Sequence, residues 1–172
     1  MRRVFSERRV PVPETWESVK GAKKMAEKLW KKEYDALVTE ALGARKKAYA
    51  PYSHFQVGAA LLAEDGTVFT GCNVENASYP VGICAERNAF AHAVCEGHTK
   101  FAALAIAGGP AEKNGSDFCA PCGMCRQFIR EFCGPDFPVI LPKCDEEGKI
   151  SEKNVFTLEE LLPESFGPEN LK

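Results

Sequence analysis

The sequence predicts a single α/β domain, a three-layer α/β/α sandwich built around a mixed, mostly five-stranded sheet. Three observations favour this class. Helical and strand patterns follow one another in the order α-α-β-β-α-β-α-β-β-α. The stretch 101–107 is continuously apolar, as in a strand that is covered on both faces. The length of 172 residues suits one domain with its own core.

The first two predicted helices span residues 15–33 and 34–49. Residues 1–33 carry ten Lys or Arg and five Glu, so we treat them as a basic, helical N-terminal extension of a domain over 34–172. The lysines of the helix over 15–33 form a basic face that could bind a membrane surface or a partner. We favour the alternative that this helix packs on its own domain or on another subunit. The second helix should end at Ala50, because the residue before a proline avoids helical angles. The side of this helix that faces the core is expected to carry Leu37, Val38, Ala41, Leu42 and, at its margin, Arg45.

A β-hairpin is predicted next, with strands over 56–63 and 67–73 joined by the turn pair Asp65-Gly66. The remaining elements alternate. We expect a helix over 85–96, a strand over 101–107, a helix over 121–132 with Pro in its first turn, a strand over 138–143, a short strand near Val155, and a short helix opened by the capping-box pattern of Thr157 and Glu160.

Charge and composition exclude several classes of protein. The body, 34–172, has twelve basic and nineteen acidic residues, a balance that favours a small uncharged substrate over a nucleic-acid strand. No apolar run reaches the roughly 20 residues of a membrane span. The N-terminus lacks the apolar stretch of a secretory signal, so we expect a cytoplasmic protein whose eight cysteines serve a metal site or remain thiols.

Two short motifs carry the predicted chemistry: Cys84-Ala-Glu86 and Pro121-Cys-Gly-Met-Cys125. Cys84, Cys122 and Cys125 can hold Zn²⁺ through three thiolates and leave the fourth position to water, as catalytic zinc sites do. Glu86 can then move protons without binding the metal, which is the pattern of zinc deaminases. Cys84 precedes one predicted helix and the other pair opens a second, where the positive helix end favours thiolates.

Three thiolates give the zinc centre a formal charge of −1, which a nearby cation should offset. Arg87 follows Glu86 and Arg126 follows Cys125, and we expect Arg87 rather than Arg126 to donate hydrogen bonds to ligand sulfurs.

Two other readings of the cysteines remain. Cys119, Cys122 and Cys125 begin an iron–sulfur spacing, but Ile129 stands where that spacing needs its fourth cysteine. A fourth ligand from Cys72, Cys119 or Cys133 would close the site into a structural zinc centre, which would leave Glu86 and its spacing unexplained.

With these motifs in view, the sequence closely resembles the homotetrameric cytidine deaminases that act on the free nucleoside. The resemblance covers about residues 42–171. It rests on APYSHFQVGAA at 50–60, GCNVEN at 71–76, Tyr79 with GICAER at 82–87, PCGMCRQ at 121–127 and LLPESFGP at 161–168.

The resemblance implies a role for each matching position. Cys84, Cys122 and Cys125 would be the zinc ligands and Glu86 the proton shuttle. The remaining positions would bind substrate: Asn73 and Glu75 at the ribose 3′-hydroxyl, Phe55 in the pocket wall, Ala85 through its backbone N–H at the base carbonyl, and Tyr79 and Phe166 from neighbouring subunits, with Phe166 packing on the pyrimidine. Each active site would then lie at a subunit interface, and a monomer would be inactive. Taken alone, most of these residues read as ordinary core or turn positions.

The predicted reaction is the hydrolytic deamination of cytidine or deoxycytidine, with Glu86 carrying protons from water to ring N3 and to the leaving amine. A deaminase of a modified cytosine nucleoside, such as the blasticidin antibiotic, is the alternative enzyme. A nucleic-acid editor fits the acidic body poorly, and a zinc-stabilised binding module is the non-enzymatic alternative. The chain departs from the family pattern in residues 1–33, in long segments at 108–118 and 144–154, and at Asn88 and Met124.

Overall fold

The computed structural model describes residues 23–115 and 117–171, with side chains from residue 34 onward. The predicted helix over 15–33 and its basic face therefore lie largely outside the described residues. None of the described helices is both long and apolar enough to span a membrane.

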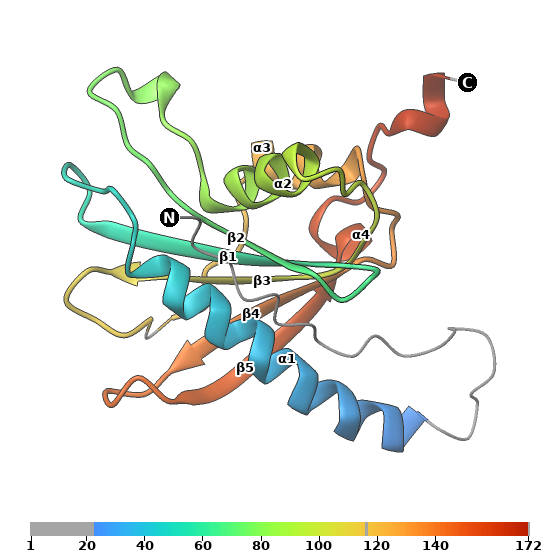
Figure 1. Cartoon of the computed structure of the whole chain (residues 1–172), viewed down its shortest axis with the longest axis horizontal. Coiled ribbons are helices and arrows are strands. Elements are labelled where there is room, and N and C mark those ends of the chain that lie inside the picture. Colours follow the sequence, from blue (N-terminus) through green and yellow to red (C-terminus); the bar gives the residue numbers. More distant parts are fainter. Residues whose placement is uncertain (1–22, 116, 172) are drawn as a thin grey trace, which may run out of the picture.

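A five-stranded mixed sheet forms the middle of the molecule (Figure 1), as predicted. Its strand order is β2-β1-β3-β4-β5. Strand β1 runs antiparallel to both of its neighbours, β3 and β4 are parallel, and β5 is antiparallel to β4. The strands are β1 (Phe55–Ala63), β2 (Val68–Cys72), β3 (Phe101–Pro110), β4 (Pro138–Cys144) and β5 (Ile150–Thr157).

Helices cover both faces of this sheet, which gives the predicted three layers. Helix α1 (Lys23–Arg45) lies on one face, and α2 (Ala85–Cys95) and α3 (Gly123–Arg130) lie side by side on the other (Figure 1). The short helix α4 (Leu158–Leu161) follows β5 and begins with the predicted capping box between Thr157 and Glu160.

Two cores result, because alternate residues of each strand point to opposite faces. The core under α1 combines Leu37 and Val38 of the helix with mostly small side chains of the sheet, such as Ala60 and Ala105, and with Ile140 of β4. The core under α2 and α3 is larger and includes Leu61, Phe90, Leu104, Ile106, Ile129 and Leu141.

The predicted break between two N-terminal helices is wrong. One helix runs from Lys23 to Arg45, since no proline and no glycine interrupts it before Gly43. It also ends four residues before the predicted Tyr49. The backbone of Tyr49 instead pairs with the chain after β2: its N–H donates to Asn73 O at 3.0 Å, and its carbonyl accepts from Glu75 N at 2.8 Å. This pairing draws the loop before β1 to the end of β2.

Two glycines let the helices approach the sheet closely. A Cβ on Gly58 of β1 would overlap the backbone of Ala41 and Arg45 in α1, and one on Gly71 of β2 would overlap the backbone of Ala85 and Ala89 in α2. The first of these contacts lies near the end of α1 and the second near the start of α2, and the chain next to each of these helix ends contributes residues to the site described next.

Residues 108–118 and 144–154 pack against each other. Cys144 N donates to Gly115 O at 2.9 Å, and Asn114 Nδ2 donates to Glu146 O at 2.9 Å. Strand β5 is correspondingly longer than the short strand predicted near Val155, because the chain after β4 turns back at Gly148 and pairs along the full edge of β4.

Candidate metal centre and active site

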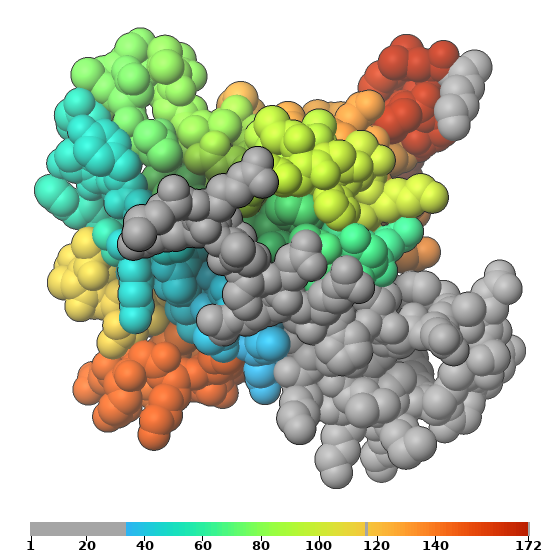
Figure 2. Space-filling view, viewed as in Figure 1, coloured from blue at the N-terminus to red at the C-terminus, as the bar shows by residue number. Residues whose placement is uncertain are grey.

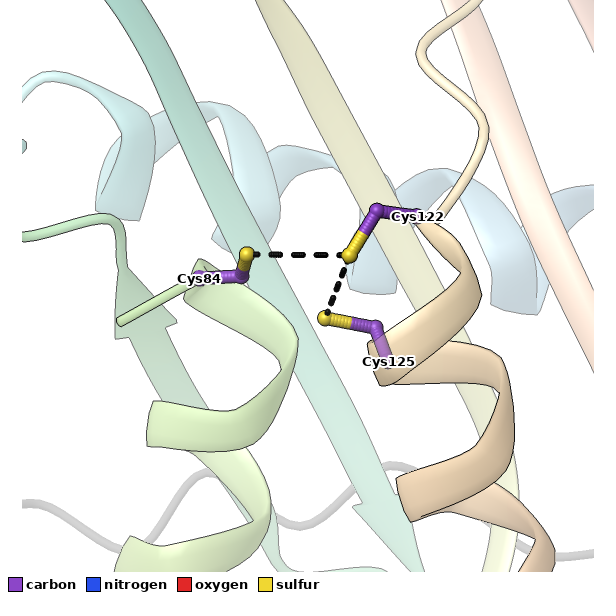
Figure 3. Close-up of side chains that lie close together, drawn as sticks. All are labelled: Cys84, Cys122 and Cys125. Atoms are coloured by element: carbon purple, nitrogen blue, oxygen red, sulfur yellow. Dashed lines mark hydrogen bonds between the residues drawn. The ribbon is translucent and has the colours of Figure 1, made fainter. Parts of the chain in front are cut away.

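Three cysteine sulfurs meet where α2 and α3 begin (Figure 3). Cys84 is the residue before α2, Cys122 is the residue before α3, and Cys125 lies in the first turn of α3. The Sγ atoms of Cys84 and Cys122 are 3.9 Å apart, and those of Cys122 and Cys125 are 3.6 Å apart. All three lie within 4.8 Å of one another, close enough to bind one ion. The sequence motifs, 38 residues apart, are thus brought together by the side-by-side packing of the two helices.

No fourth ligand joins these sulfurs within residues 23–115 and 117–171. The Cys72 thiol donates to Lys47 O at 3.4 Å, Cys119 lies against Gly108, and Cys133 is buried in the core under α3. Ile129, at the position that an iron–sulfur spacing would need, is also a core residue. The donor set is therefore three soft thiolates with room for a further ligand, and this fits a catalytic zinc ion.

The surroundings of the sulfurs stabilise negative charge. Neither Cys84 nor Cys122 caps its helix with a side-chain hydrogen bond, so the unpaired N–H groups of both first turns remain near the sulfurs. Hydrogen bonds from Cys125 and from Arg87 lower the pKa of Cys84 to about 5. The interaction with Cys84, together with burial, raises the pKa of Cys125, so that this sulfur keeps its thiol proton in the absence of a metal. Binding of Zn²⁺ displaces that proton.

Glu86 lies in the first turn of α2 and is only 4% exposed. Burial raises the pKa of its carboxyl group. The side chain is in hydrogen-bonding range of Cys125, so the carboxyl group lies beside the sulfur cluster. A buried carboxyl group next to an open metal position can both accept and return a proton near neutral pH.

The two arginines of the motifs have different partners. Arg87 Nη2 lies 3.9 Å from Cys84 Sγ, while its buried Nε has no hydrogen-bond partner. Arg126 instead donates to backbone carbonyls, from Nε to Pro121 O at 2.7 Å and from Nη1 to Leu161 O at 2.6 Å. Arg126 therefore ties the turn before α3 to the end of α4.

A cavity of about 460 Å³ opens beside Cys84. Four of the residues singled out in the sequence line it: Asn73, Glu75, Tyr79 and Cys84. Its other walls come from the chain on either side of these residues, including Tyr52, Ser53, Asn76 and Ile83. Its size is within the usual range of a small-molecule site.

The polar side chains of the cavity also hold its walls in place. Asn73 Oδ1 accepts from Val57 N at 2.8 Å and its Nδ2 donates to Phe55 O at 2.9 Å, which fixes the start of β1. Glu75 accepts from the backbone N–H of Tyr52 at 2.9 Å and of Ser53 at 3.2 Å. The Ser53 hydroxyl also donates to Glu75 and is the largest contribution that lowers the pKa of this carboxyl group.

The remaining candidates are placed in different ways. Ala85 is fully buried and is the first residue of α2, so its N–H has no partner inside the helix. Phe55 is 40% exposed at the start of β1 and does not line the cavity. Tyr79 is 76% exposed, with its ring centroid 6.0 Å from that of Tyr52. Phe166, 58% exposed, does not line this cavity either.

Sequence reasoning placed Arg45 on the core edge of its helix but missed what it does. Its side chain is 4% exposed and donates to the carbonyls of Gln56, Gly109, Pro110 and Lys113 at the ends of β1 and β3. Its position in an otherwise apolar stripe of the helix could have indicated this role, because a buried arginine must donate its hydrogen bonds to buried acceptors.

Taken together, a three-layer α/β/α fold with an open three-thiol metal centre and a buried glutamate defines a zinc-dependent hydrolytic enzyme. Residues 31–141 match the family described as the cytidine and deoxycytidylate deaminase zinc-binding region. This chain belongs to that family, and all three ligand cysteines and Glu86 fall within the matched residues.

Relatives and solved structures agree with this membership. A cytidine deaminase of Sporosarcina psychrophila is 47% identical over 137 residues, which cover 80% of this chain and 93% of the relative. A probable cytidine deaminase of Dictyostelium discoideum is 41% identical over 81% of this chain and 87% of the relative. The crystal structure of cytidine deaminase from Burkholderia pseudomallei has a TM-score of 0.66 at 44% identity, covering 76% of this chain and 97% of that one.

Proposed function

We propose that this protein catalyses the zinc-dependent hydrolytic deamination of cytidine and deoxycytidine, which yields uridine or deoxyuridine and ammonia. The observation that carries the proposal is the open three-thiol centre at the edge of the 460 Å³ cavity, with the buried Glu86 beside it. The names of the relatives, all cytidine deaminases, support the same substrate class.

The chain's own residues would divide the chemistry as follows. Cys84, Cys122 and Cys125 would hold Zn²⁺, which supplies Lewis acidity toward a water molecule. Glu86 would accept a proton from that water and deliver it to N3 of the cytosine ring, so that the water oxygen can add to C4. It would then take the remaining proton of that hydroxyl group and pass it to the amine, so that the C4–N bond breaks, ammonia leaves and the C4 carbonyl forms. Arg87 would partly offset the negative charge of the three thiolates.

The nucleoside would be held by the walls of the cavity. Asn73 and Glu75 would bind the ribose 3′-hydroxyl, since each retains unused acceptor capacity after holding the neighbouring backbone. Phe55 would contact the nucleoside, and the Ala85 N–H would donate to the base carbonyl. These roles come from the family resemblance, and the lining of the cavity supports those of Asn73 and Glu75.

We also propose a homotetramer in which Tyr79 and Phe166 enter the sites of neighbouring subunits. Both aromatic side chains are more than half exposed. Phe166 does not line the cavity of its own chain, whereas Tyr79 stands at the wall of that cavity and is exposed enough to reach a neighbouring subunit as well. Light scattering after gel filtration should give a mass close to four times 18.9 kDa. A chain that is monomeric and active would contradict the proposal.

Residues 1–33 would be an extension that the reaction does not need, because the relatives match over about 80% of this chain yet are themselves almost fully covered. A chain that begins at Tyr34 should therefore keep its cytidine turnover. A cytoplasmic location fits the eight cysteines, none of which is in a disulfide.

The decisive experiment is the conversion of free cytidine by the zinc-loaded protein, followed by ultraviolet absorbance. Turnover that disappears in Glu86→Gln, at one zinc per chain in both proteins, would establish the reaction. No turnover of cytidine or deoxycytidine at full zinc content would overturn it. Modified cytosine nucleosides would then be tested next, and failure with those as well would leave the zinc-stabilised binding module.

A further inference from the structure

The chain after α4 is attached to α3 almost entirely by polar contacts. We call residues 162–171 the C-terminal segment. Gln127 Nε2 donates to Phe166 O at 3.0 Å, and Arg130 Nε donates to Ser165 Oγ at 2.9 Å. Arg130 also forms an ion pair with Glu169. The side chains that hold the segment thus come from the same short helix that carries Cys125.

Apolar packing contributes little to this attachment. Gly167 is the only residue of the segment that is fully buried, and Phe166 and Leu171 are 58% and 78% exposed. A cavity of about 180 Å³, lined by Arg130, Leu158, Leu162, Glu164 and Ser165 among others, lies under the start of the segment. Figure 2 shows the end of the segment (red, upper right) projecting from the body of the molecule. The position of the segment therefore depends on its few polar contacts.

Arg130 is the central residue of this attachment. Its side chain is only 11% exposed and bonds to residues on both sides of Phe166. Gly167 packs directly on the guanidinium group, where a Cβ would overlap Cζ and both Nη atoms. Any residue larger than glycine at position 167 would displace the guanidinium group.

We propose that Arg130 is a positioning residue that fixes the C-terminal segment so that the Phe166 ring is presented to the nucleoside site of a neighbouring subunit. Gly167 supplies the space that the Arg130 side chain needs. This inference rests on the proposed function, because it assigns to Arg130 control over the aromatic residue that would pack on the pyrimidine.

Two variants test the inference by different routes. Arg130→Met removes the donors, whereas Gly167→Ala keeps Arg130 but displaces its guanidinium group. Arg130→Lys keeps the positive charge but cannot bond to Ser165 and Glu169 at once. The KM and the cleavage rate of this variant, both described below, should therefore lie between those of Arg130→Met and of the unchanged protein. The matched control is Lys153→Met, which removes the ion pair with Asp35 on the other side of the sheet, where the exposed fractions of the partners are similar.

The first readout is steady-state kinetics with cytidine at full zinc content. Both Arg130→Met and Gly167→Ala should raise KM about tenfold, the effect of one lost charge-assisted hydrogen bond. Their kcat should stay within about twofold, because the chemistry at Glu86 is untouched and only binding is weakened. Lys153→Met should change neither constant.

The second readout does not depend on activity. A protease that cleaves after glutamate should cut at Glu164 about ten times faster in Arg130→Met and Gly167→Ala. The cleavage rate is proportional to the fraction of molecules in which the segment is detached, and this fraction should rise in both variants. The rate in Lys153→Met should be unchanged.

An unchanged cleavage rate would show that the segment is held without Arg130, and an unchanged KM with faster cleavage would show that its position does not matter to the substrate. Either result overturns the inference. A loss of kcat at constant KM would also overturn it, because it would indicate a disturbed metal centre. If the unchanged protein does not deaminate cytidine, the proposed function fails first, and the cleavage rates still decide whether Arg130 holds the segment.

Discussion

At the scale of single residues, Glu86 combines two properties that are seldom found together. Its carboxyl group is almost fully buried, and it lies beside the sulfur cluster that can hold a metal ion. Burial raises the pKa of Glu86, which makes its carboxylate a stronger base than an exposed glutamate and suits it to accept a proton.

Glu86→Gln should therefore leave the metal centre intact and remove the proton carrier. We expect one zinc per chain, measured by atomic absorption, and a loss of kcat by about 10³-fold. The amide has nearly the same shape, so the melting temperature should change little. Turnover close to that of the unchanged protein would remove Glu86 from the proposed role.

The cysteines outside the metal centre should differ sharply in reactivity. Burial raises the pKa of Cys119 to about 11 and that of Cys133 to about 12, so at pH 8 both remain thiols, which are poor nucleophiles. Cys95 is exposed. Iodoacetamide added to the zinc-loaded protein should label Cys95 and spare Cys119 and Cys133, as read by peptide mass spectrometry.

The residues that form the metal site could be predicted from the sequence because a motif specifies them. The contacts of the neighbouring side chains often could not. The spacing of Cys84, Cys122 and Cys125 was enough to predict a shared ion, because each side chain needs only to reach one point. Arg126 was the less favoured of the two arginines as a donor to sulfur, and its actual partner, the carbonyl of Leu161, lies 35 residues away. Such a partner depends on where α4 packs, which no local pattern contains.

At the scale of elements, the approach of α1 to the sheet depends on Gly58. Gly58→Ala would place a methyl group against backbone atoms of Ala41 and Arg45, which cannot move aside as a side chain could. We expect the free energy of unfolding to fall by about 3 kcal/mol, measured by urea denaturation.

The matched control lies in the helix itself. Gly43 of α1 has no other atom near the position of a Cβ, so Gly43→Ala should instead raise the free energy of unfolding by about 0.5–1 kcal/mol, through the better helix propensity of alanine. Equal effects of the two substitutions would contradict the role given to the Gly58 contact.

The elements themselves were well predicted by periodicity and turn signals, and their boundaries less so. The Asp65-Gly66 hairpin and the Thr157 capping box are as expected, because each is specified by residues next to one another. The end of α1 is not, since it depends on the pairing of Tyr49 with the chain after β2. Helix α3 is likewise shorter at both ends than the predicted 121–132, because Cys122 is its N-cap and the chain turns at Glu131.

At the scale of the whole molecule, the metal should act as a crosslink between α2 and α3. Removing zinc with a strong chelator would remove the ion that links Cys84, before α2, to Cys122 and Cys125 at the start of α3. We expect the melting temperature to fall by about 10 °C and cytidine turnover to vanish. Added Zn²⁺ should restore both. A melting temperature that does not respond to the chelator, at proven zinc loss, would show that the metal serves the chemistry alone.

The overall architecture could be predicted because the order of helices and strands allows few arrangements. The apolar stretch 101–107 in the middle of the sheet requires cover on both faces. Helix α1 covers one face, and the core under α2 and α3, which includes Leu104 and Ile106, covers the other. The cavity could not be predicted in the same way. Its walls come from loops between Tyr52 and Cys84 whose course is fixed by Asn73 and Glu75, and this is a tertiary effect of two side chains.

The separation of Cys84 from the other two ligands has a consequence for synthesis of the protein. At ordinary translation rates, Cys84 leaves the ribosome about 2 to 8 s before Cys125. When β3 has emerged, and before Cys122 does, the nascent chain contains β1, β2, α2 and β3 but has only one of its three metal ligands. The zinc ion must therefore be acquired after the central part of the sheet has been made, and a cell short of zinc would accumulate chains that are largely folded and inactive rather than chains arrested early.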